Sequence, residues 1–194
     1  MAPPTLILCI DPRLSGGGYP QYILTHAARL NNDEGDEHKF FSLYDKILNY
    51  WFPPTEGYDV CLKWFIDTES TINIVIEHYH HPLLLVEIQP PSAFRFDSGR
   101  GNAIYQLLSD LDEIGPENLH ADRLYAISAI GKRWRACYIL KGMDSEGAQP
   151  VKGIAIRNSF RSPHPECWNA DISSYASWAA LQRIVETIKG YVTK

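Results

Sequence analysis

The chain lacks long apolar runs. No stretch approaches the roughly 20 consecutive apolar residues that a membrane-spanning helix requires. The apolar run at residues 5–10 is too short for a secretory signal peptide, and no basic residue precedes it. We therefore interpret residues 5–10 as a short strand, and we expect a soluble, intracellular protein, cytoplasmic or nuclear, with no membrane partner.

Closely spaced cysteines are also absent. The cysteines are far apart along the sequence: Cys9, Cys61, Cys137 and Cys167. The absence of a Cys-x-x-Cys pair argues against a structural zinc site and against a disulfide-dense secreted scaffold. The glycine-rich segment at residues 15–20 lacks the Lys-Ser/Thr ending of a phosphate-binding loop, so we interpret it as a connector. With 194 residues, 45% of them hydrophobic, the chain can form one domain, residues 1–194, with its own core.

An excess of positive charge is missing as well, since the formal net charge is −5. Nucleic-acid binding depends on Lys and Arg that neutralise phosphates, so this balance counts against high-affinity duplex binding. Basic residues do gather locally, because Arg133 and Arg135 share one face of a predicted strand while Trp134 faces the other way. Such a strand can contact a nucleic-acid backbone, but we expect a solvated strand face with Trp134 in the core. Arg157 and Arg161 follow in a later loop.

Two neighbouring apolar runs end in polar residues. Residues 83–89 read Leu-Leu-Leu-Val-Glu-Ile-Gln, so Glu87 and Gln89 project from the same face of a predicted strand. Carboxylates are rarely fully buried without a partner, which favours a prepared site; the alternative is the solvated rim of a sheet. Because a polar connection at residues 78–82 joins this run to the one at residues 71–77, we predict a β-hairpin with a loop of about five residues.

The hairpin register predicts which residues meet. With a turn near residue 80, the numbers of paired residues sum to about 160, so Glu87 faces Asn73. Asn73, Glu87 and Gln89 then cluster at the open end of the hairpin, whereas Glu77 lies on the same face nearer the turn. A slip of one residue would turn every side chain to the other face of the strand.

Helical spacing predicts an amphipathic helix at residues 40–51 and a final helix at about 172–192, capped by Ser173 or Ser174. The connection at residues 78–82 carries three histidines, which we interpret as a surface turn rather than a metal site. The remaining predicted elements are, in order, a strand at 59–66, a loop at 90–102 that holds Arg95 and Arg100, a helix at 103–111, strands at 123–130 and 131–140, an edge strand at 152–157 and an irregular segment at 159–169.

On these elements the chain resembles the PD-(D/E)XK, or restriction-endonuclease-like, nuclease superfamily. The resemblance rests on the hairpin, on Glu87-Ile88-Gln89 in place of Glu-x-Lys, on Gln106 in the following helix, and on the order strand, helix, strand, strand. It covers roughly residues 36–140 and implies an α/β (α+β) fold with a central mixed β-sheet flanked by helices. Two positions depart from the pattern, since Asn73 stands where the family usually has Asp, and Gln89 where it has Lys.

The resemblance implies divalent-metal-dependent hydrolysis of phosphodiester bonds in nucleic acid, with Mg²⁺ or Mn²⁺ as cofactor. The catalytic residues that it implies are Glu87, Gln89, Asn73 and Gln106. The metal ligands that it implies are Glu87, Asn73 and, at the start of the first helix, Glu37. Glu77, on the same strand face, is a further predicted ligand, and Asp59, Asp67 and Glu34 are other candidates. Because asparagine and glutamine carry no charge, we expect weak metal binding unless another acid contributes.

Three hypotheses about function stay open. The first is a metal-dependent phosphodiesterase. The second is a catalytically inactive nuclease-like fold that serves as a binding or interaction module. The third is an unrelated α+β protein whose hairpin mimics the motif.

Overall fold

The computed structural model describes residues 18–31, 37–65, 71–115, 119–151, 154 and 160–192. The predicted strand at residues 5–10 and residues 15–17 of the connector lie outside these ranges. The predicted edge strand at residues 152–157 also lies outside them, apart from Ile154.

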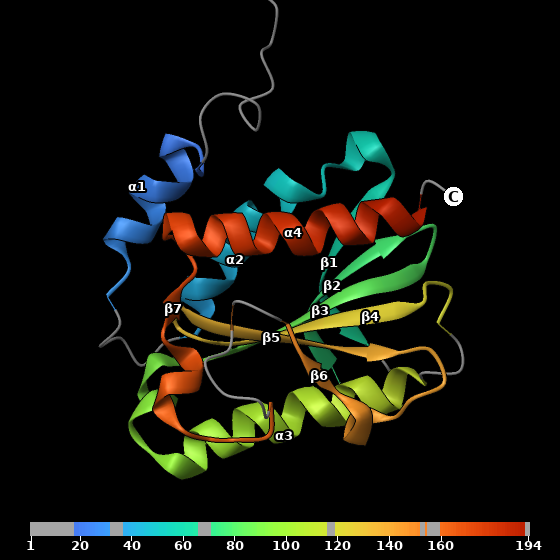
Figure 1. The fold of residues 1–194 in the computed structure, drawn as a ribbon. Coiled ribbons are helices and arrows are strands. Elements are labelled where there is room, and N and C mark those ends of the chain that lie inside the picture. The colour runs from blue at the N-terminus through green and yellow to red at the C-terminus, as the bar shows by residue number, and fades with distance from the viewer. Residues whose placement is uncertain are drawn as a thin grey trace, which may run out of the picture.

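A mixed β-sheet forms the centre of the molecule (Figure 1). Its strands are β1 (Tyr58–Phe65), β2 (Thr71–His78), β3 (His81–Gln89), β4 (Arg123–Ile130), β5 (Arg133–Leu140), β6 (Gln149–Pro150) and β7 (Ala170–Asp171). Their order is β1-β2-β3-β4-β5-β6, and β7 pairs with β5. Neighbours run antiparallel except β3 and β4, which are parallel. The predicted fold class, a central mixed sheet flanked by helices, is therefore confirmed.

Helices cover both faces of this sheet. Helix α3 (Asp97–Ile114) crosses one face, while α2 (His38–Trp51) and α4 (Tyr175–Val192) lie on the other (Figure 1). Helix α1 (Gln21–Arg29) packs on α2 and has no counterpart among the predicted elements. Its nine residues carry no side-chain cap at the N-terminus, so the usual start signal is missing from the sequence.

Alternation along the strands divides the core into two apolar clusters. In β4, Tyr125 and Ile127 belong to the cluster with α2 and α4, whereas Leu124 and Ala126 belong to the cluster with α3. Helix α2 buries the residues whose spacing predicted it: Phe40, Leu43, Tyr44, Ile47, Leu48 and Trp51. Because helices cover both faces, β3 and β4 are buried along most of their length.

The connection between β2 and β3 is shorter than predicted. β2 ends at His78 and β3 begins at His81, so the loop holds only Tyr79 and His80. Both loop residues have positive φ angles, 50° and 65°, as a type I′ hairpin turn requires. The predicted five-residue loop was wrong because Pro82 indicated a loop. In the structure Pro82 lies within β3 and pairs with Glu77, next to a register shift between Ile76 and Glu77.

The predicted loop at residues 90–102 is also wrong. Residues Pro91–Arg95 form a 3-10 helix, and α3 begins at Asp97. Gly99 lies inside this helix and has a packing role there. A Cβ atom on Gly99 would lie 2.3 Å from the carbonyl oxygen of Ala93, so only glycine allows the helix to start this close to the preceding turn.

The final helix begins where its cap was predicted. The backbone N–H of Ser177 donates to Ser174 Oγ at 3.1 Å, which identifies Ser174 as the capping residue. Across the described ranges, no helix combines the length and the apolar character needed to cross a membrane.

Candidate functional site

Asn73 and Glu87 meet at the open end of the hairpin formed by β2 and β3. The ladder pairs Ile74 with Val86, which confirms the predicted register at this end. At the next pair, Asn73 and Glu87, hydrogen bonds from backbone N–H groups to side-chain oxygens take the place of backbone–backbone bonds. The backbone N–H of Asn73 donates to Glu87 Oε1 at 2.8 Å, and the backbone N–H of Ile88 donates to Asn73 Oδ1 at 2.7 Å. Each strand is thus bound by a side chain of the other.

Helix α3 brings a third polar residue to the same place. Gln106 Nε2 donates to Glu87 Oε2 at 3.0 Å, and Gln89 Nε2 donates to Gln106 Oε1 at 2.9 Å. The four residues that the resemblance implies as catalytic are therefore joined by hydrogen bonds. Their catalytic roles stay a prediction.

Glu87 is fully buried, with 0% of its surface exposed, while its three partners are half-buried. Burial above all, together with the neighbouring Asp110, raises the pKa of Glu87 to about 9, against the opposing effect of the hydrogen bond from the Asn73 N–H. The cause is the loss of hydration, because a charged carboxylate is poorly tolerated in a low-dielectric interior. Glu87 is therefore protonated at neutral pH, or shares a proton with its neighbour.

That neighbour, Asp110, was not predicted as a site residue. It is 6% exposed and lies on α3 within hydrogen-bonding reach of Glu87. Burial raises the pKa of Asp110 to about 7, and its buried Oδ2 accepts no hydrogen bond from a donor in the described chain. Each of two carboxyl groups this close opposes the ionisation of the other, so the pair holds a proton near neutral pH. The available signal was helical spacing, since Asp110 follows Gln106 by one turn.

We call Asn73, Glu87, Gln89, Gln106 and Asp110 the Glu87 network. Of the other predicted metal ligands, Glu37 directly precedes α2, and its charge is a minor cause of the raised pKa of Glu87. Asp67 and Glu34 fall outside the described residues.

Glu77 lies away from the Glu87 network. It is 8% exposed, and Cys61 Sγ donates to its Oε2 at 3.5 Å. Along β2 it is separated from Asn73 by roughly 13 Å, at about 3.3 Å per residue. Asp59 pairs with Glu77 across β1 and β2, so it is equally remote from Glu87.

Arg135 is buried, contrary to the predicted solvated face. Trp134 is in the core as predicted, but Arg135 is 0% exposed as well. Its guanidinium lies 4.1 Å from the ring centre of Phe160 and 4.6 Å from that of Trp168. It also donates to the carbonyl oxygens of Ser162 and Phe160, at 2.9 and 2.5 Å. The segment expected to be irregular folds over β5 and encloses the cation.

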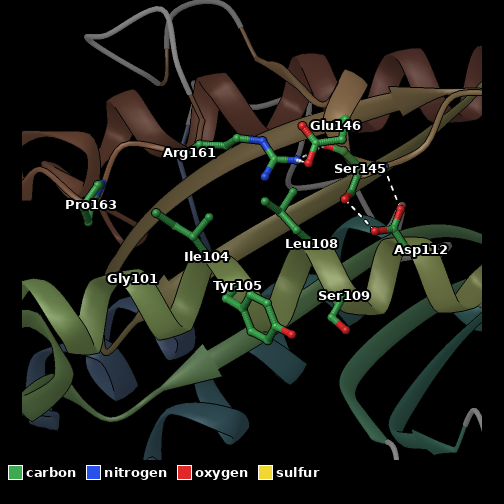
Figure 2. A pocket seen from close by; sticks show the side chains of 10 residues that line it. All are labelled: Gly101, Ile104, Tyr105, Leu108, Ser109, Asp112, Ser145, Glu146, Arg161 and Pro163. Carbon is green, nitrogen blue, oxygen red and sulfur yellow. Dashed lines mark hydrogen bonds and ion pairs between the residues drawn. The ribbon is translucent and has the colours of Figure 1, made fainter.

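Other basic residues noted in the sequence also bind the protein itself. Arg100 lies in α3 rather than in a loop, and its Nε donates to the carbonyl oxygen of Pro163 at 2.6 Å. Arg161 forms an ion pair with Glu146 at 3.1 Å (Figure 2). These intramolecular contacts reduce the positive charge available to a nucleic-acid backbone.

A hollow of about 350 Å³ lies between α3 and the segments that carry Glu146 and Arg161. Figure 2 shows Ile104 and Leu108 of α3 pointing toward the ion pair of Arg161 and Glu146, while the Tyr105 ring points away from it. The residues of the Glu87 network do not line this hollow. It is therefore a separate feature.

The Glu87 network does not fit Mg²⁺ in this arrangement. Both Glu87 oxygens accept N–H groups, and so does Asn73 Oδ1. Mg²⁺ requires octahedral oxygen ligands and keeps several waters, which a fully buried carboxyl cannot accommodate. Among the residues that the structure describes, no group of three or more His, Cys, Asp or Glu side chains is placed to hold a metal ion. A Mg²⁺ or Mn²⁺ cofactor stays a prediction.

Comparison with known proteins gives little further guidance. No family model matches the chain, and no curated protein matches its sequence. Among solved structures, the chain is similar to the type IIG restriction endonuclease BpuSI, with a TM-score of 0.45 and 12% sequence identity over 91% of this chain. The match spans only 18% of that enzyme. At this identity and TM-score, we draw no conclusion about function from it.

Proposed function

We propose that the chain is a nuclease-like fold without hydrolytic activity that serves as a binding or interaction module. The element order supports the nuclease-like core, since β2 and β3 carry Asn73 and Glu87, α3 carries Gln106, and β4 and β5 follow. The observation that carries the proposal is the full burial of Glu87, with both oxygens bound by the Asn73 N–H and the Gln106 amide.

Hydrolysis of a phosphodiester would require three properties of the Glu87 network. An ionised carboxylate must reach a metal ion, a cation must offset charge on the phosphate, and water must enter. Glu87 is buried and its pKa is raised to about 9. Gln89 cannot supply positive charge. The network therefore acts here as a structural link between the hairpin and α3.

One observation favours the alternative, a Mg²⁺- or Mn²⁺-dependent phosphodiesterase. Asp110 places a second carboxyl beside Glu87, which offsets the missing charge at Asn73. If α3 moved outward, two acids would face the same opening. We rank this function second because it requires a rearrangement of both the helix and the hydrogen bonds of Glu87.

The deciding experiment is a cleavage assay on single- and double-stranded DNA and RNA, with Mg²⁺ or Mn²⁺ titrated in. We expect no metal-dependent product above the level of the Glu87→Ala variant. The Glu87→Gln variant serves as a folded control, because glutamine keeps the shape of the buried side chain. Metal-dependent cleavage by the wild-type chain that is lost in Glu87→Gln would contradict the proposal and establish the second function.

A further inference from the structure

A second hollow, of about 620 Å³, lies between α4 and the strands β4, β5 and β6. It is on the sheet face opposite α3 (Figure 1). It also lies toward the other end of β4 from the Glu87 network, because Arg123 and Tyr125 line it near the start of β4 while Ser128, near the end of that strand, pairs with Glu87. Its volume falls within the range of about 300–1,000 Å³ found for small-molecule sites.

The walls of this hollow carry two arginines from different elements. Arg123 opens β4, and Arg183 projects from α4. Neither forms a salt bridge with an acidic residue in the described part of the chain. This differs from Arg100 and Arg161, which are paired with Asp97 and Glu146. In a chain of net charge −5, two guanidinium groups that form no salt bridge within the described residues create a local positive site in this hollow.

Arg123 is held in place by its neighbours. Its guanidinium lies 4.7 Å from the ring centre of Tyr138. It is also hydrogen-bonded to Tyr125, which in turn is hydrogen-bonded to Thr187 of α4. The hydrogen bond to Tyr125 is the main cause of a raised pKa for Arg123. Groups from both the helix and the sheet therefore hold this cation in place. A ligand that binds it would lose little free energy in ordering the Arg123 side chain.

We propose that this hollow binds a small organic phosphate of about the size of a nucleoside monophosphate. A phosphate monoester carries a charge of about −1.5 to −2 and three acceptor oxygens, which match two guanidinium forks better than a single carboxylate does. Pro150, Val151 and Ile184 line the same hollow and offer apolar contact to the body of the ligand. This inference goes beyond the proposed function and does not depend on it.

The test is calorimetric titration of the full chain with AMP, inorganic phosphate and adenosine. We expect AMP to bind, phosphate to bind more weakly, and adenosine to give no measurable heat. Raising the salt concentration should weaken AMP binding, because exposed charges are screened. Arg183→Gln should weaken AMP binding roughly tenfold or more, as expected for a lost charge-assisted hydrogen bond.

Matched variants separate this site from other effects. Arg183 is exposed, so its substitution should not disturb folding, whereas Arg123→Gln also removes the stacking on Tyr138. Arg161→Gln, at the hollow beside α3, and Glu87→Gln should leave AMP affinity unchanged. The proposal is overturned if neither AMP nor phosphate binds at millimolar concentration. It is also overturned if adenosine binds as well as AMP, if phosphate binds as well as AMP, or if Arg183→Gln has no effect.

Discussion

At the scale of single residues, the Glu87 carboxyl sets the character of the candidate site. Its position at a strand end first indicated a functional carboxylate, but its surroundings favour the neutral form. Two N–H groups bind its oxygens, and Asp110 lies beside it with a raised pKa of its own. A buried side chain with this many partners contributes to stability chiefly through what would be left unpaired without it.

Substitution of Glu87 should separate shape from charge. Glu87→Ala should lower the free energy of unfolding by about 2–4 kcal/mol, because it leaves a cavity and unpaired N–H groups. Glu87→Gln should cost less, about 1–2 kcal/mol, because glutamine fills the same space and can donate to Asp110, but its NH2 group cannot accept one of the two N–H groups that Glu87 binds. Urea denaturation followed by tryptophan fluorescence measures both values. Equal losses in the two variants would contradict the network as described.

The same carboxyl pair should make stability depend on pH. Both folded pKa values lie above the ordinary values of 4.5 for Glu and 3.8 for Asp, so the folded chain keeps protons that the unfolded chain releases. The contribution of this pair to the free energy of unfolding is therefore fully present below about pH 4. It falls as the pH rises toward about pH 9, by up to about 1.4 kcal/mol per pH unit for each retained proton. Denaturation midpoints measured between about pH 5 and about pH 9 should fall accordingly. The decline should be shallower in Glu87→Gln, and a flat wild-type profile would argue against a shared buried proton.

At the scale of elements, the hairpin of β2 and β3 could be predicted from nearby residues, whereas the loop over β5 depends on contacts between residues far apart in the sequence. The hairpin register was predictable because alternation and turn position fix it over a short distance. The burial of Arg135 was not predictable, because the aromatic rings that enclose it come from residues 160 and 168 along a segment without periodicity. Asp110 lies between these cases: its spacing from Gln106 was visible, but not that its helix face packs on Glu87.

The turn offers a stabilising substitution. His80 has a φ of 65°, which is unfavourable for a residue with a side chain and costs glycine nothing. His80→Gly should therefore raise the free energy of unfolding by about 0.5–1 kcal/mol. His80→Ala is the matched control, since it removes the same imidazole without relieving the backbone. Thermal denaturation that shows the same change in both variants would mean that the imidazole, not the φ angle, is responsible.

The contact between β5 and its covering loop should be sensitive to a conservative change. Arg135→Lys should lower the free energy of unfolding by about 2 kcal/mol or more, because lysine can neither stack between two rings nor donate to both carbonyl oxygens. Arg133→Lys is the matched control, since Arg133 is half-buried and should cost about 1 kcal/mol or less. Urea denaturation measures both. An unchanged Arg135→Lys variant would show that the buried fork contributes little.

At the scale of the whole molecule, the fold class was predicted through the family resemblance of the ordered elements, whereas the second hollow was not predicted. The order of hairpin, helix, strand and strand could be predicted because each unit carries its own periodicity, whereas the parallel direction of β3 and β4 comes from the structure. Arg123 and Arg183 are 60 residues apart in the numbering, so only the packing of α4 on the sheet places them in one hollow. Helix α1 also depends on such packing, since it has no capping signal of its own.

The response of the whole molecule to divalent cations provides the last prediction. A ligand that binds only the folded chain raises its stability, by about 2.7 kcal/mol at 100 times its dissociation constant. That corresponds to a shift of several degrees in a chain of this size. Because the Glu87 network does not fit Mg²⁺, millimolar Mg²⁺ or Mn²⁺ should leave the unfolding midpoint unchanged. A rise in the wild-type midpoint that is absent in Glu87→Gln would indicate a metal site there.

The carboxyl pair joins two different layers, since Glu87 belongs to the sheet and Asp110 to α3. At alkaline pH both carboxyls should be ionised, and repulsion between Glu87 and Asp110 should weaken the packing of α3 on the sheet. We expect the amides of α3 to lose protection from hydrogen exchange before those of α2 and α4 as the medium becomes alkaline. Local unfolding would then begin with the detachment of α3, while α2 and α4 stay packed on the other face of the sheet.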